Sequence, residues 1–126
     1  HNMEFARTGE GRAIYFDAFI RDFSPEELGF TLDTYWVQAG GGNPSRWIKK
    51  LAGRVPCVHL KDMAISGTQT RMAPVGEGNL DFDDILDACE QAGAKYLLVE
   101  QDDCYGEDPF ECLAVSYRNL AAKGLK

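Results

Sequence analysis

The chain contains the stretch Val55-Pro56-Cys57-Val58-His59-Leu60-Lys61-Asp62, an apolar run that ends in polar side chains. The apolar part can be buried as a strand, but a strand does not require His, Lys and Asp at its carboxyl end. Because side chains alternate along a strand, His59 and Lys61 share one face and Leu60 points to the other. The stretch therefore predicts a buried strand that carries a functional site at its carboxyl end.

Two other segments repeat this design, Phe30-Thr31-Leu32-Asp33-Thr34-Tyr35-Trp36 and Tyr96-Leu97-Leu98-Val99-Glu100-Gln101-Asp102. Each is an apolar strand that leads to a carboxylate, Asp33 in the first and Glu100 in the second. Doubly wound sheets and TIM barrels both place their sites at the carboxyl ends of parallel strands. We therefore expect Asp33, His59 and Glu100 to converge on one metal ion.

Strands alternate with helices along the chain, which predicts an α/β fold of parallel (β/α) units. A complete TIM barrel needs about 250 residues, so the 126 residues predict one domain that forms a (β/α)4 half-barrel over residues 1–126. Strands are expected at 1–5 (its end only), 30–38, 55–60 and 96–100. Helices are expected near 13–23, after Asn43, after Asp81 and after Asp108, and a long functional loop over 63–79.

Composition and charge exclude several classes. Thirteen basic against twenty acidic residues give a net charge of −7, which disfavours nucleic-acid binding. No apolar run approaches the ~20 residues that span a bilayer, and we expect no membrane partner. The four cysteines show no metal-finger spacing, so we expect free thiols in a reducing cytoplasm.

Asp33, His59 and Glu100 are a mixed set of oxygen and nitrogen ligands, which suits Mn, Mg, Co or Zn. Each residue also has a simpler interpretation. Asp33 could be satisfied by loop amides, and His59 could be a hydrogen-bonded core histidine. The three together favour the metal site.

Other residues are candidates for contact with a substrate. Lys61 could bind a substrate oxygen or stabilise an enolate; alternatively it forms an ion pair with Asp62 or Asp102. Arg71, in the expected loop, could hold a hydroxyl, carboxylate or phosphate, or be solvated. Trp36 could form an apolar wall against a sugar ring, or belong to the core.

The first residues supply two more candidates. His1 could act as a base near the metal, and Glu4 could be a fourth metal ligand or a general base. Glu100 could also move a proton. A frayed terminus is the simple alternative for His1.

The motifs together resemble the xylose isomerase-like TIM barrels, also called sugar phosphate isomerases/epimerases. They cover nearly the whole chain in the family's order: His1-x-x-Glu4-Phe5, Leu32-Asp33-x-Tyr35-Trp36, Val58-His59-Leu60-Lys61-Asp62, Pro74-Val75-Gly76-Glu77-Gly78 with Leu80-Asp81-Phe82, and Val99-Glu100-Gln101-Asp102.

The resemblance implies the C-terminal half of a (β/α)8 barrel and a divalent metal held by Asp33, His59 and Glu100. Many relatives carry His-Asn-His-x-x-Glu-Phe where this chain begins, which places the fourth ligand before residue 1 and leaves Glu4 as the fallback. Keto-sugar epimerases often have His at the position of Trp36, so their proton-transfer details do not carry over.

The leading hypothesis is a divalent-metal-dependent isomerase, epimerase or dehydratase that acts on a sugar, keto-sugar or cyclitol. The alternative is a non-catalytic half-barrel or carbohydrate-binding module. Either a second copy of the chain or an N-terminal half would complete the barrel, since exposed strand edges favour association. The DNA-cutting branch of the superfamily needs more histidines than the two present.

Overall fold

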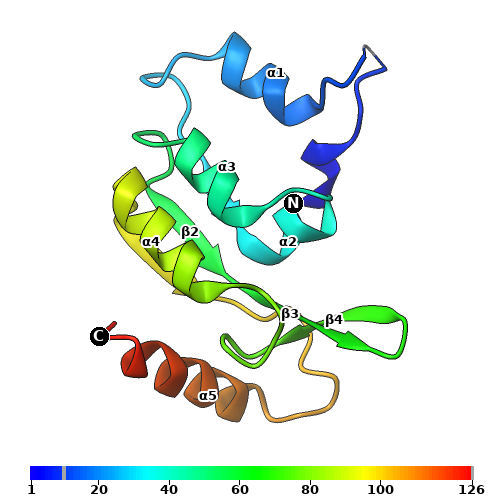
Figure 1. Ribbon diagram of the computed structural model, residues 1–126, viewed down its shortest axis with the longest axis vertical. Helices are drawn as coiled ribbons and strands as arrows, with labels where there is room; N and C mark the ends of the chain where they lie inside the picture. The colour runs from blue at the N-terminus through cyan, green and yellow to red at the C-terminus, as the bar shows by residue number, and fades with distance from the viewer. Residues whose placement is uncertain (10, 126) are drawn as a thin grey trace.

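A computed structural model describes residues 1–9 and 11–125 of the chain (Figure 1). Three strands form a parallel sheet in the order β1-β2-β5, with bounds Thr31–Asp33, Cys57–Leu60 and Tyr96–Val99. The register pairs Asp33 with His59 and Leu60 with Val99. The predicted α/β fold with a parallel sheet is confirmed, and the carboxyl ends of its strands lie together at one edge.

Three helices begin directly after the capping residues that the sequence predicted: α3 (Pro44–Lys50), α4 (Phe82–Ala92) and α5 (Pro109–Ala122). The side chains of Asn43, Asp81 and Asp108 each accept a backbone N–H of the first helical turn, at 2.9, 3.1 and 2.9 Å. Such caps satisfy N–H groups that have no partner inside the helix. The other helical elements are η1 (Asn2–Phe5, a 3-10 helix), α1 (Tyr15–Asp22) and α2 (Thr34–Ala39).

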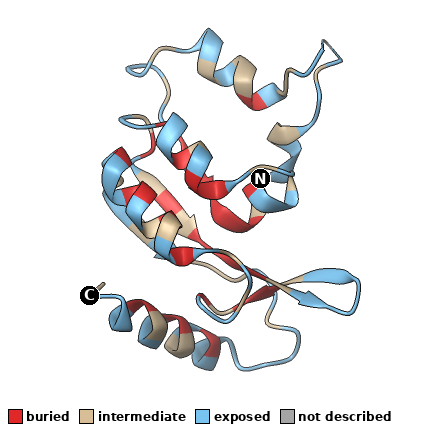
Figure 2. Cartoon of the chain, viewed as in Figure 1, coloured by how far each residue is buried: buried red, intermediate tan, exposed pale blue. Residues whose placement is uncertain are grey.

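The main core lies between one face of the sheet and the helices. Leu32, Val58 and Leu60 are buried and form one cluster with Ile48 of α3 and Ile85 of α4. Figure 2 shows the buried residues gathered on the sheet and on the sides of these helices that face it. Each fully buried aliphatic side chain contributes roughly 1.5–3 kcal/mol to folding, so this face of the sheet stabilises the fold.

The opposite face of the sheet is open in the part of the chain that the structure describes. Tyr96 and Leu98 of β5 are 63 % and 49 % exposed, whereas Leu97 and Val99 pack against the core. This alternation is the one that a strand with one buried face requires. His59 follows the same alternation, so the open face is also the face of the candidate site.

Two predicted strands need correction. Residues 1–5 do not end a strand; Asn2–Phe5 form η1, whose Phe5 ring packs edge-on against Trp47 with centroids 5.3 Å apart. The strand expected over 30–38 ends at Asp33, because the Asp33 carboxylate accepts the backbone N–H of Trp36 and starts α2. The sheet among the described residues therefore has three parallel strands rather than four.

The long loop expected over 63–79 is wrong in its first part. Residues Asp62–Ser66 (β3) and Gln69–Ala73 (β4) form an antiparallel hairpin. Gly67, with φ of 62°, makes the two-residue turn. Met63 and Met72 pack with Tyr35 in a small second core, which explains why the hairpin is ordered.

Within residues 1–9 and 11–125, the structure contains no helix with the length and apolar character needed to cross a membrane.

Candidate metal centre

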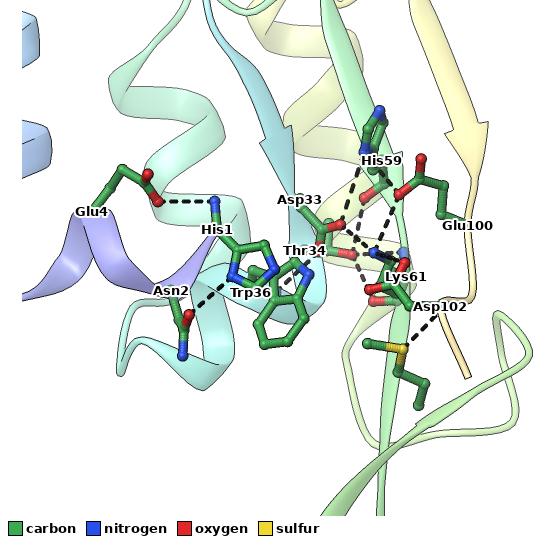
Figure 3. A network of polar contacts seen from close by, with 11 residues as sticks. His1, Asn2, Glu4, Asp33, Thr34, Trp36, His59, Lys61, Glu100 and Asp102 are labelled. Carbon is green, nitrogen blue, oxygen red and sulfur yellow. Dashed lines mark hydrogen bonds and ion pairs between the residues drawn. The ribbon is translucent and has the colours of Figure 1, made fainter. Parts of the chain in front are cut away.

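Three side chains meet at the carboxyl edge of the sheet (Figure 3). Asp33 ends β1, His59 lies in β2, and Glu100 directly follows β5. One ligand atom from each lies within 4.8 Å of the others, so the three residues could hold a metal ion. The parallel register creates this convergence, because Asp33 and His59 are paired residues of neighbouring strands.

The two oxygens of Asp33 have different partners. Oδ1 accepts the backbone N–H of Trp36 at 2.9 Å, while Oδ2 lies 3.9 Å from His59 Nδ1 and 2.9 Å from Lys61 Nζ. The simpler interpretation of Asp33, a carboxylate satisfied by a loop amide, therefore describes only one of its oxygens. The other faces the cluster.

His59 and Glu100 form the accessible side of the cluster. His59 Nδ1 lies 3.0 Å from Glu100 Oε2, and the two side chains are 26 % and 42 % exposed. A histidine nitrogen aimed at carboxylate oxygens, with solvent access on one side, is an arrangement that a metal and a substrate could both reach. Two carboxylates and one imidazole suit a divalent cation such as Mn, Mg, Co or Zn.

Lys61 lies beneath this group and is nearly inaccessible, with 2 % of its side chain exposed. Its ammonium contacts three carboxylates: Asp102 at 2.7 Å, Asp33 at 2.9 Å and Glu100 at 3.2 Å. Burial alone would lower the pKa of Lys61, but the hydrogen bonds to Asp102 and Asp33 outweigh it and raise this pKa. Of the two ion pairs considered from the sequence, the structure contains the one with Asp102; Lys61 therefore stays charged inside the cluster.

Thr34 holds the strand ends in place. Its side chain is fully buried, and its Oγ1 donates to the backbone oxygen of Lys61 at 2.7 Å. The same Oγ1 accepts the backbone N–H of Lys61 at 2.9 Å. This reciprocal pair fastens the start of α2 to the end of β2, so it fixes Asp33 relative to His59.

Asp62 has a structural role next to the cluster. Its fully buried carboxylate accepts backbone N–H groups from Met63, Gly76, Gly78 and Leu80, at 2.7 to 3.2 Å. Burial raises the pKa of Asp62, and these N–H donors oppose that shift. Asp62 thereby ties the Pro74-Val75-Gly76-Glu77-Gly78 turn to β3, which agrees with the predicted shaped turn.

The remaining sequence candidates lie at different distances from the cluster. The Trp36 ring centroid is 5.9 Å from Lys61 Nζ, and the His1 ring stacks on Trp36 with centroids 3.6 Å apart. Glu4 points away from the cluster toward the His1 amino group, at 3.0 Å (Figure 3). The structure thus brings His1 and Trp36 to the side of the site and leaves Glu4 outside the group.

Arg71 is directed elsewhere. It lies on β4, forms an ion pair with Glu107 at 3.3 Å and stacks on the Tyr105 ring at 4.4 Å. The structure does not bring it to the metal-binding group.

Sequence reasoning gave no site role to Asp102 or Thr34. Asp102 was considered only as a surface partner of Lys61, because it lies in an acidic loop in which any carboxylate could be solvated. Thr34 carried no signal, since its role depends on a neighbouring strand 27 positions away. Its position directly after Asp33 was the only available hint.

Comparison with known proteins now identifies the family. The model of the family "Xylose isomerase-like TIM barrel" matches residues 1–115. The chain belongs to this family. No curated protein matches the chain.

Solved structures agree with this assignment. Two crystal structures described as a sugar phosphate isomerase/epimerase from Parabacteroides distasonis ATCC 8503 align with TM-scores of 0.78 and 0.77. They show 27 % and 26 % identity over 97 % and 96 % of the chain. A xylose isomerase domain protein from Planctomyces limnophilus aligns with a TM-score of 0.67 at 23 % identity over 92 % of the chain, and this likeness supports the fold alone.

The chain spans only part of these structures, 43 %, 43 % and 42 % of their lengths respectively. It is therefore a partial TIM barrel, as predicted. The open face of the sheet, with Tyr96 and Leu98 exposed, is consistent with a barrel wall that lacks its remaining strands.

Proposed function

We propose that the protein is a divalent-metal-dependent isomerase, epimerase or dehydratase that acts on a sugar, keto-sugar or cyclitol. The observation that carries this proposal is the convergence of Asp33, His59 and Glu100 within 4.8 Å, in a chain of this family. The two Parabacteroides structures that align with the chain are described as sugar phosphate isomerase/epimerase proteins. The metal is Mn, Mg, Co or Zn, in line with the mixed oxygen and nitrogen donors.

The site fits such a metal. His59 Nδ1 lies 3.9 Å from Asp33 Oδ2 and 3.0 Å from Glu100 Oε2, and nitrogen and oxygen atoms of these kinds are ligands that divalent cations accept. When bound, the metal supplies Lewis acidity that polarises a substrate carbonyl and its neighbouring hydroxyl. Glu4 is the proposed fourth ligand, and its carboxylate would have to turn away from the His1 amino group, which lies 3.0 Å from it.

The side chains of the protein would then position the substrate and move the proton. Glu100, 42 % exposed at the mouth of the cluster, is the proposed base, and His1 beside Trp36 is a second candidate. Trp36 would support the apolar face of a sugar ring. A substrate oxygen would contact Lys61 by replacing one of its three carboxylate partners. Arg71 would bind substrate only after its ion pair with Glu107 breaks.

A second candidate is a half-barrel without its own turnover, such as a carbohydrate-binding module. The open sheet face, on which Tyr96 and Leu98 are exposed, favours it. This candidate predicts sugar binding without metal-dependent turnover.

The test is metal analysis of the purified protein, followed by assay of keto-sugars and inososes for isomer or dehydration product in D2O. We expect bound divalent metal, turnover that EDTA abolishes, and deuterium at the carbon next to the carbonyl. His59→Ala should lose both metal and turnover, whereas Asp103→Asn, a charge change on a side chain that contacts the Tyr105 amide, should keep both. Full activity with normal metal content in His59→Ala would refute the proposal.

A further inference from the structure

The metal-binding group contains its own cation. The Lys61 ammonium contacts Asp33 Oδ2 and Glu100 Oε2, the same two oxygens that approach His59 Nδ1. An ammonium and a divalent metal would therefore share two carboxylates and repel each other at short range. Some other group has to hold the ammonium when the metal binds.

Asp102 is the third carboxylate around this ammonium. Its Oδ1 makes the shortest of the three contacts, 2.7 Å, and it does not belong to the group that could hold the metal. It lies in the segment after β5, so it approaches Lys61 separately from Asp33. When a metal engages Asp33 and Glu100, Asp102 is the partner that remains for Lys61.

The structure holds Asp102 in place for this contact. Its backbone N–H donates to Met72 Sδ at 3.2 Å, and the Met72 N–H donates to the Tyr105 hydroxyl at 3.0 Å. The segment after β5 is thereby attached to β4 at two points. Asp102 is 47 % exposed, yet the position of its main chain is fixed by the hairpin.

The charges of the cluster support the same role. Three carboxylates and one ammonium leave a net charge of −2, which a divalent cation neutralises. Without the Asp102 carboxylate the net charge of the cluster changes from −2 to −1. The only carboxylates left to contact Lys61 are then those of Asp33 and Glu100, which the metal would bind. Outer residues that orient metal ligands typically affect metal affinity 10–100-fold.

We propose that Asp102 is a positioning residue for the metal centre: it holds the Lys61 ammonium and so leaves Asp33 and Glu100 available to a divalent cation. Asp102 acts through Lys61 and does not itself bind the metal. This inference rests on the proposed function, because it requires the metal centre.

The experiment titrates the full protein with Co²⁺ by calorimetry and records its visible absorption at saturation. Asp102→Asn removes the charge with little change of shape, and the matched control Asp103→Asn removes a neighbouring charge that does not touch Lys61. We expect Asp102→Asn to weaken Co²⁺ binding by about tenfold or more. Asp103→Asn should stay within about twofold of the wild type. Asp102→Glu, which keeps the carboxylate, should recover most of the affinity.

The spectrum separates positioning from ligation. When Asp102→Asn is saturated with Co²⁺, it should show the same Co²⁺ absorption bands as the wild type, because the residues that bind the ion are unchanged. Altered bands would make Asp102 a ligand and would overturn the inference, as would equal affinity in the two Asn variants. Absence of Co²⁺ binding by the wild type would instead refute the proposed function, and the inference with it. Circular dichroism of each variant tests whether the fold is retained. If Asp102→Asn does not fold, the Co²⁺ absorption spectrum of Asp102→Glu is compared with that of the wild type instead. Shifted Co²⁺ bands in Asp102→Glu would again overturn the inference.

Discussion

Gly78 lies directly against Asp62. The Gly78 N–H donates to Asp62 Oδ2 at 2.9 Å, and a Cβ at Gly78 would collide with Asp62 Oδ1 and with the Met63 backbone oxygen. The glycine is required here by close approach, since its φ is not positive. The turn that follows the hairpin is therefore built around one buried carboxylate.

Substitution at this contact should destabilise the protein. Gly78→Ala would push the chain away from Asp62 and weaken its buried hydrogen bonds, at a cost of about 1–3 kcal/mol. Gly29→Ala is the matched control, because a Cβ there meets its neighbours at ordinary distances of 3.5 Å or more. Urea unfolding measures both variants, and equal midpoints would contradict the prediction.

Thr34 should contribute to stability through its hydroxyl. Thr34→Val keeps the shape but leaves the buried Lys61 N–H without an acceptor, which should cost about 1–3 kcal/mol. Thr34→Ser retains the hydroxyl and should recover most of this loss. Chemical denaturation of the three proteins tests the prediction; if Thr34→Val and Thr34→Ser lose the same free energy, packing and not the hydrogen bond is the cause.

Metal binding should stabilise the folded state. At a free Mn²⁺ concentration of about 100 times Kd, linkage predicts a gain of roughly 2.7 kcal/mol in the free energy of unfolding. The gain should vanish with EDTA and be absent in His59→Ala, which lacks one corner of the group. Thermal unfolding with and without Mn²⁺ measures it. An equal shift in His59→Ala would place the stabilising ion elsewhere.

The cysteines should react in a fixed order. Cys89 is buried, and burial raises the pKa of its thiol to about 11. Cys57 and Cys104 are only half-buried. Iodoacetamide at pH 8 should therefore modify Cys57 and Cys104 well before Cys89, because the thiolate is the reactive form. Peptide mass spectrometry at successive times measures the order of modification. Modification of Cys89 as fast as that of Cys57 and Cys104 in the native protein would contradict the prediction.

Much of the fold could be predicted because local signals and long-range packing agree. The helices after Asn43, Asp81 and Asp108 are capped by these residues, so the local sequence is enough to predict where each helix begins. The ends of β2 and β5 were also predictable, since apolar runs stop there. The convergence of Asp33, His59 and Glu100 followed from parallel strands whose ends lie at one edge.

The errors have a shared physical origin. The apolar residues after Asp33 predict a longer strand. The Asp33 side-chain oxygen caps α2 instead, and this cap outweighs their preference for a strand. The β3–β4 hairpin is stabilised by Met63, Met72 and Tyr35, and the third of these is distant in sequence. The role of Asp102 depends on a lysine 41 positions away. Contacts of this kind are invisible to spacing and composition.

The two tryptophans of the chain lie in different environments, so their fluorescence can report two different events. Trp47 stacks on Phe16 with centroids 4.9 Å apart and packs, half-buried, against the main core. Trp36 stacks on His1 and lies beside Lys61 at the carboxyl edge of the sheet. Indole emission from Trp36 will respond to a paramagnetic ion or a ring-shaped ligand at the cluster, while emission from Trp47 follows unfolding. Replacing either one by Phe leaves a protein whose fluorescence reports a single event.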